Sequence, residues 1–143
     1  MDIIEATMQD IEDLTILMEH LGYPTTIDNM KIRFSNIFSK SDYKTLIALI
    51  DDRVVGMIGL IKCLSYEMDG CYVRIGALVV HSDYQNKGIG KRLIEEAENF
   101  ARSIGASGIV LNSGNRPERM KAHQFYKNQG YSDKSTGFVK KLD

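Results

Sequence analysis

The chain has 143 residues, of which 43% are apolar and 26% are charged, and its formal net charge is −1. This composition is that of an ordinary globular protein, and it excludes a disordered or collagen-like chain. Because acidic and basic residues balance, the charge gives no reason to expect nucleic acid or an anionic membrane surface as a partner.

The first half of the chain alternates between strand and helix signals. Residues 3–6 are a short strand candidate, and Asp10 precedes an apolar stripe at helical spacing that Gly22 ends. Thr26 is placed to cap a second helix, whose apolar positions run to Phe38. Two antiparallel strands, 45–50 and 54–64, follow on either side of a turn at 51–53.

The second half contains a strand, a helix and a further strand in succession. An Asp-Gly turn begins a strand over 71–80, and strict alternation places Cys71, Val73, Ile75, Ala77 and Val79 on one of its faces. An amphipathic helix from 89 to about 104 and a strand over 108–111 complete a crossover whose two strands run parallel. A last helix, about 119–128, precedes short strands near 131 and over 137–142.

The cysteines and the beginning of the sequence favour a cytoplasmic protein. Cys63 and Cys71 have no partners at metal-ligand spacing, so we expect reduced thiols and no metal site. Residues 1–5 lack the features of a signal peptide, and no apolar run approaches the ~20 residues that span a bilayer. Without a repeat or a linker, we expect a single domain, 1–143.

The loop after the strand 71–80 has the sequence Gln-Asn-Lys-Gly-Ile-Gly-Lys over residues 85–91. Gly88 and Gly90 permit a tight turn, and the amides of the helix that begins there are free to bind an anion, which the helix dipole also favours. Lys87 and Lys91 add positive charge to this phosphate cradle. A plain strand-to-helix turn would have the same two glycines, so the pattern alone does not name a ligand.

Two common phosphate-binding motifs do not fit this loop. A P-loop needs glycine where Gln85 stands and Ser or Thr where Arg92 stands. A dinucleotide fingerprint needs a third glycine where Leu93 stands. Both mismatches disfavour a nucleotide-phosphate enzyme.

The motif Gln85-x-x-Gly88-x-Gly90, between a buried strand and an amphipathic helix, resembles the acetyl-coenzyme A (acetyl-CoA) signature of the GNAT superfamily of N-acetyltransferases. The segment from Ala122 to Tyr131 is similar to the C-terminal A-x-x-F-Y-x-x-x-G-[FY] motif of that family. The resemblance implies an α/β (α+β) fold. Its sheet is mixed and mostly antiparallel, with six or seven strands and a central parallel pair, and about four helices flank it.

The resemblance also implies the site residues. The loop amides would hold the coenzyme pyrophosphate, and the end of the strand would pair with the pantetheine arm next to a bulge near Gly76. The implied coenzyme-binding residues are Leu78, Val79, Val80, Gln85, Asn86, Lys87, Gly88, Ile89, Gly90, Lys91 and Asn115.

Acetyl transfer to an amine needs a proton for the departing thiolate and a donor for the oxyanion of the tetrahedral intermediate. By the resemblance Tyr126 faces the coenzyme sulfur, and its hydroxyl, with an ordinary pKa near 10, can give that proton. The Val79 amide is the expected oxyanion donor. The strand 71–80 carries no carboxylate to act as general base, so water-mediated deprotonation is expected. Glu67, Asp69 and His123 remain other candidates for this base.

The sequence thus predicts an enzyme that moves an acetyl group from acetyl-CoA to a primary amine of a small molecule or a protein. The alternative is a non-catalytic sensor or assembly module that binds acyl-CoA on the same fold. The acceptor stays open, because the residues that would shape its site also read as core or surface. A homodimer is plausible for a domain of this size.

Overall fold

The computed structural model describes residues 1–115 and 117–143. The described chain divides into two compact units, Met1–Val110 and Leu111–Asp143, and each is taken by itself. The first unit contains strands β1 Asp2–Glu5, β2 Tyr43–Ile50, β3 Arg53–Leu64, β4 Cys71–Val80 and β5 Ile109–Val110, helices α1 Ile11–Leu21, α2 Ile27–Phe38 and α3 Ile89–Ser103, and short 3₁₀ turns at Met8–Asp10 and Ser82–Tyr84. The second unit contains a 3₁₀ turn, Pro117–Arg119, and helix α4 Met120–Asn128.

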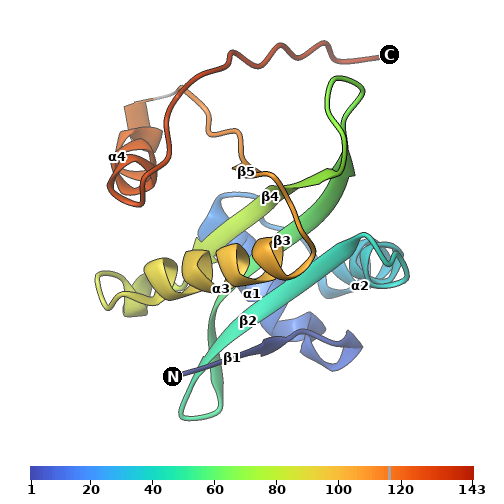
Figure 1. Ribbon diagram of the computed structural model, residues 1–143. Coiled ribbons are helices and arrows are strands. Elements are labelled where there is room, and N and C mark those ends of the chain that lie inside the picture. Colours follow the sequence, from blue (N-terminus) through green and yellow to red (C-terminus); the bar gives the residue numbers. More distant parts are fainter. Residues whose placement is uncertain (116) are drawn as a thin grey trace. The chain divides into compact units, whose positions relative to one another are not determined.

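The five strands form one sheet in the order β1-β2-β3-β4-β5 (Figure 1). The first four pair antiparallel, and β4 pairs parallel with β5. This confirms the mixed, mostly antiparallel α/β fold with its parallel pair and about four helices.

The expected strand count of six or seven is too high. No described residue after Val110 belongs to a strand, so the predicted strands near Tyr131 and over 137–142 are absent. Phe138 and Val139 are instead more than 90% exposed. An apolar, β-branched run becomes a strand only where another strand offers its backbone groups, and the sequence pattern does not show whether it does.

Local signals explain where the helices begin and end. Thr7 and Asp10 form a reciprocal capping box before α1, and Gly22 ends that helix in the left-handed conformation (φ 102°). The Thr26 hydroxyl accepts a hydrogen bond from the backbone amide of Asn29 and caps α2, as predicted.

The helices cover both faces of the sheet in Figure 1, with α3 in front and α1 and α2 behind. On the α1/α2 face, Leu14, Leu17 and Phe34 pack with Ile47 and Val79 in one apolar cluster. On the α3 face, a Cβ atom added to Gly56 would lie 3.3 Å from the side chains of Ile89 and Leu93, two residues of α3. Burial of these two apolar layers holds the sheet between the helices.

A bulge interrupts β4 at Gly76. Gly59 pairs with Ala77 while Leu60 pairs with Ile75, so Gly76 has no partner of its own on β3. The bulge therefore lies where the family resemblance placed it. On the other side of β4, β5 pairs only with Val73 and Arg74, so the parallel pairing stops before the bulge.

The bulge also exchanges the two faces of β4, which corrects the strict alternation that the sequence suggested. Before it, the Cys71 sulfur lies 3.8 Å from the Ile104 carbonyl oxygen at the end of α3. After it, Ala77 and Val79 pack with the α1/α2 cluster instead of sharing the face of Cys71. One extra residue in a strand shifts every later side chain to the opposite face.

Both cysteine thiols are free. Among the described residues, no helix is long and apolar enough to span a bilayer. Within the same residues, no group of three or more His, Cys, Asp or Glu could hold a metal ion.

Candidate active site

The loop between β4 and α3 leaves several backbone amides without acceptors. Asn86 and Gly88 both adopt the left-handed conformation, with φ of 61° and 79°, and this turns the chain sharply into α3. The first helical hydrogen bond joins the Arg92 amide to the Gly88 carbonyl at 3.1 Å. The amides of residues 88–91 therefore precede the helical ladder, and Gly88 supplies no side-chain cap.

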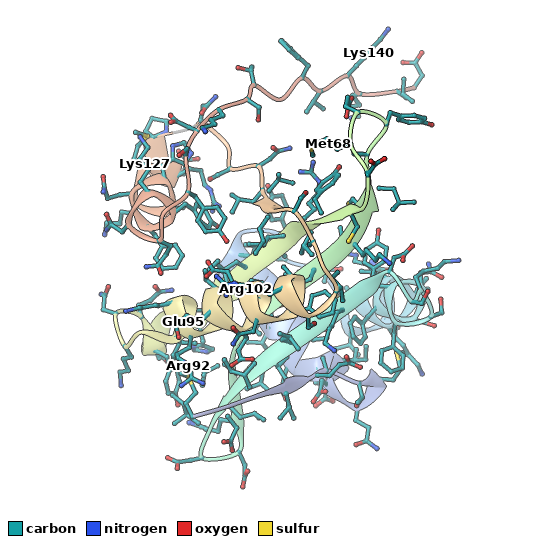
Figure 2. All side chains as sticks on the ribbon, in the orientation of Figure 1. Met68, Arg92, Glu95, Arg102, Lys127 and Lys140 are labelled. Carbon is teal, nitrogen blue, oxygen red and sulfur yellow. The ribbon has the colours of Figure 1, made fainter. Side chains whose placement is uncertain are left out.

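The charges around this helix end also suit an anion. The first turn of α3 contains no acidic residue. Arg92 on the exposed face of α3 (Figure 2) is ion-paired with Glu95 at 3.8 Å and with Glu96 at 4.0 Å, one turn after the free amides. Free amides together with the positive end of the helix dipole make an anion-binding site.

The side chains predicted around this cradle have distinct positions. Ile89 is buried and packs α3 onto the sheet, so only its backbone is available to a ligand. The Lys87 ammonium lies 5.5 Å from the centroid of the Tyr84 ring, and Lys91 is exposed. The side-chain nitrogen Nε2 of Gln85 donates to the Val80 carbonyl oxygen at 2.8 Å, and this bond ties the loop to the end of β4.

The end of β4 presents unpaired backbone on its β5 side. The His81 amide donates to the Val55 carbonyl of β3 at 2.8 Å, which fixes the direction of the peptide groups here. The direction of these groups alternates along a strand. The N–H and C=O groups of Val79 therefore also point toward β3, while those of Leu78 and Val80 point away from it. Since β5 does not extend this far, the amides of Leu78 and Val80 have no strand partner among the described residues.

This geometry bears on the amide that was expected to bind the oxyanion. The Val79 amide, the expected oxyanion donor, faces β3, and its side chain lies in the α1/α2 cluster. The amides of its two neighbours, Leu78 and Val80, face away from β3. The sequence could not show this, because the bulge at Gly76 sets the direction of every later peptide group.

Tyr126 and Asn115 belong to the second unit. Tyr126 lies on α4, with its ring centroid 5.4 Å from that of Phe125 and 6.2 Å from that of Tyr131. Burial raises the pKa of the Tyr126 hydroxyl above its usual value of 10, and the nearby positive charge of Arg119 opposes this shift. The hydroxyl is therefore protonated at neutral pH. Asn115 is exposed in the loop before α4.

The candidates for the general base lie in unrelated places. The Glu67 carboxylate accepts a 2.6 Å hydrogen bond from Ser65 at the exposed β3–β4 hairpin, and this bond lowers its pKa, which weakens it as a base. His123 Nε2 lies 2.7 Å from the Gly114 carbonyl oxygen in the second unit. Neither contact identifies a base.

His20 and His81 belong to no motif in the sequence. In the structure their rings meet at the start of the cradle loop, with centroids 4.0 Å apart and planes inclined by 40°. The two residues are far apart in the chain, and no sequence motif joins them. Only the fold reveals this contact.

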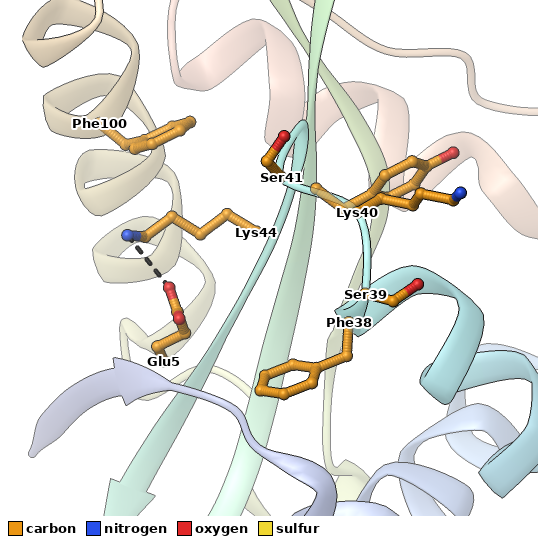
Figure 3. A pocket seen from close by; sticks show the side chains of 8 residues that line it. Glu5, Phe38, Ser39, Lys40, Ser41, Lys44 and Phe100 are labelled. Atoms are coloured by element: carbon orange, nitrogen blue, oxygen red, sulfur yellow. Dashed lines mark ion pairs between the residues drawn. The ribbon is translucent and has the colours of Figure 1, made fainter.

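A shallow hollow of about 360 Å³ is lined by residues that include Glu5 of β1, Lys44 of β2 and Phe100 of α3 (Figure 3). Glu5, Phe38, Lys44 and Phe100 contribute to its walls, and the Lys44 ammonium lies 3.1 Å from the Glu5 carboxylate. Phe100 is twelve residues after Gly88, about 18 Å further along α3. The hollow therefore contains none of the predicted site residues.

Comparison with known proteins adds the following findings. A family model described as "Acetyltransferase (GNAT) family" matches residues 8–131. A GNAT family acetyltransferase of Staphylococcus aureus is 35% identical, with a TM-score of 0.85 over 99% of this chain and 100% of that one. An "IAA acetyltransferase" of Azospirillum brasilense is 27% identical over 130 residues, which are 91% of this chain and 79% of the relative. A putative acetyltransferase from Agrobacterium tumefaciens shares the fold at 18% identity, with a TM-score of 0.89 over 99% of this chain and 100% of that one.

Proposed function

The chain belongs to the GNAT acetyltransferase family, which makes it an acyltransferase, and on that premise we propose that it moves an acetyl group from acetyl-CoA to a primary amine. The observation that carries this proposal is the pairing of a free helix end with a free strand edge. The amides of residues 88–91 and those of Leu78 and Val80 lie at the two ends of one loop, without acceptors among the described residues. A ligand with phosphates at one end and amides along its arm matches both features.

The residues present fit acetyl-CoA in two ways. The loop from Gln85 to Lys91 would hold the pyrophosphate through the amides at the start of α3, with Lys87 and Lys91 adding charge. With the pantetheine arm added as a strand, the Val80 amide would donate to a carbonyl oxygen of the arm, and the Leu78 amide would face the thioester carbonyl at its end. Of the other predicted contacts, Asn115 stays a prediction. For Val79 we expect no contact through its amide, because it faces β3.

Acetyl-CoA supplies a thioester, and the residues of this chain supply the proton and the hydrogen bonds. The neutral amine attacks the carbonyl carbon, and the Leu78 amide stabilises the oxyanion that forms. As the carbon–sulfur bond breaks, the Tyr126 hydroxyl gives its proton to the thiolate. The nitrogen of the tetrahedral intermediate loses its proton to water, because β4 carries no carboxylate, and a proton from solvent restores the Tyr126 hydroxyl.

The acceptor is a primary amine of a small molecule or a protein. We also propose that the chain acts in the cytoplasm as a single domain, without a metal, and that it can form a homodimer. One observation favours the alternative, a non-catalytic sensor of acyl-CoA: β4 lacks a carboxylate that could act as general base.

Calorimetric titration with acetyl-CoA, followed by measurement of free-thiol release with a panel of primary amines, tests the proposal. A blank without amine measures the thiol signal of the protein itself, because Cys63 and Cys71 are free thiols. Binding with amine-dependent thiol release is expected. Binding without release from any amine would favour the sensor, and absence of binding would refute the coenzyme site.

A further inference from the structure

The cradle loop is attached to the rest of the first unit by two histidines from different elements. His20 lies in the last turn of α1, and His81 directly follows β4. Their ring centroids are 4.0 Å apart, and the ring planes are inclined by 40°. The ring of Tyr84 meets that of His81 edge-on, with centroids 5.8 Å apart.

Each imidazole accepts a backbone hydrogen bond from the turn at Ser82–Tyr84. The Ser82 amide donates to His20 Nδ1 at 3.4 Å, and the Asp83 amide donates to His81 Nδ1 at 3.1 Å. A nitrogen that accepts a hydrogen bond carries no proton, so each of these two bonds requires the neutral ring with its hydrogen on Nε2. Protonation of either ring would place an N–H group against a backbone N–H group and break that bond.

Protonation of both rings would also bring two positive charges to within about 4 Å of each other, an arrangement that Coulomb repulsion opposes. The ionisable groups around the pair do not remove this effect. The Asp83 carboxylate lies 3.9 Å from His81 Nδ1, but it is largely exposed. On the far side, the Arg53 guanidinium donates to the Tyr84 hydroxyl at 3.4 Å, and the Lys87 ammonium lies over the Tyr84 ring. From α1, the exposed Glu19 precedes His20.

The turn held by this pair leads directly into the cradle. Residues 82–84 connect the end of β4 to Gln85, the first residue of the cradle loop, and three residues later Gly88 begins α3. Displacement of the turn would therefore move the amides that we assign to the coenzyme.

We propose that neutral His20 and His81 are positioning residues that hold the cradle loop in its binding conformation and release it when they are protonated. The proposal rests on the proposed function, since the cradle is taken to bind acetyl-CoA. Because both hydrogen bonds to the turn require neutral rings, binding is expected to weaken as the pH falls from 8 to 5.5.

The test compares acetyl-CoA affinity at pH 8 and pH 5.5 in the wild type and in the double variant His20→Asn, His81→Asn. Asparagine offers an acceptor oxygen close to the position of Nδ1, but it does not titrate in this range. We expect the wild type to lose affinity at pH 5.5 several-fold more than the double variant does. Titration of the ligand's own phosphates is common to both proteins and cancels in this ratio.

His123→Asn is the matched control, because it removes the remaining histidine of the chain. This control is expected to keep the full pH dependence of the wild type. Equal loss of affinity in the wild type and the double variant would overturn the proposal. If the double variant does not fold, His20→Asn alone replaces it, since His20 is exposed at a helix end, and about half of the pH effect in logarithmic units should remain.

A second measurement needs no ligand. In ¹⁵N nuclear magnetic resonance spectra of the free protein, the amide signals of Ser82 and Asp83 are expected to shift together between pH 8 and 5.5. Signals that do not respond to pH would overturn the proposal. If acetyl-CoA binds at no pH, the proposed function fails, and the amide titration still decides whether the histidine pair holds the turn.

Discussion

Replacement of Gly88 by alanine tests the cradle most directly. Gly88 has φ of 79°, and a Cβ atom added there would meet no other atom within 4 Å. The substitution therefore introduces no clash, and its cost is that of a left-handed alanine, about 1–2 kcal/mol. In the free protein the exposed loop can relax out of this conformation, and ligand binding would have to restore it.

This cost converts into a weakening of acetyl-CoA binding by about 5- to 30-fold, measured by calorimetry. To the extent that the loop does not relax, the same cost appears as a loss of unfolding free energy in urea. Gly105→Ala is the matched control, because Gly105 follows the other end of α3 with φ of 72° and also has no atom within 4 Å of its Cβ position. It is expected to lower stability without changing affinity. Unchanged affinity together with unchanged stability in Gly88→Ala, or an equal loss of affinity in Gly105→Ala, would refute the assignment of the anion site.

Three further changes test the reaction, the core and the acceptor. Tyr126→Phe is expected to lower kcat by about 100-fold or more while the Kd for acetyl-CoA stays nearly constant. Because burial raises the pKa of the Tyr126 hydroxyl, its deprotonation should not limit the rate of the wild type below about pH 10. An unchanged kcat would show that Tyr126 is not the proton donor. Gly56→Ala places a Cβ atom 3.3 Å from the side chains of both Ile89 and Leu93, so urea unfolding should show a loss of about 1–3 kcal/mol, and an unchanged midpoint would contradict this packing. We expect Arg74, the one charged residue of β4, which forms no ion pair with a described residue, to contact the acceptor. On that expectation kcat/KM should be higher for amines that carry a carboxylate, and Arg74→Gln should reduce that preference. Equal preference before and after the change would exclude a contact between Arg74 and the acceptor.

Local patterns in the sequence were sufficient to predict most helices and strands of the first unit. Thr26 and Gly22 mark helix ends because a side-chain oxygen or a missing Cβ satisfies the backbone at that point. The cradle turn at Gly88 follows from the same kind of signal, a glycine between a buried strand and an amphipathic helix. These features depend on residues within one turn of each other, so the sequence by itself determined them.

The tertiary structure decided the features that depend on partners distant in the chain. The bulge at Gly76 arises from the register of β3 against β4, and it turns the Leu78 amide, rather than that of Val79, away from β3. The contact between His20 and His81 exists because α1 packs beside the end of β4. The sheet has five strands because an apolar segment near the C-terminus forms a strand only with a suitable neighbour. Pairing energies between distant segments, which no local pattern contains, determine all three features.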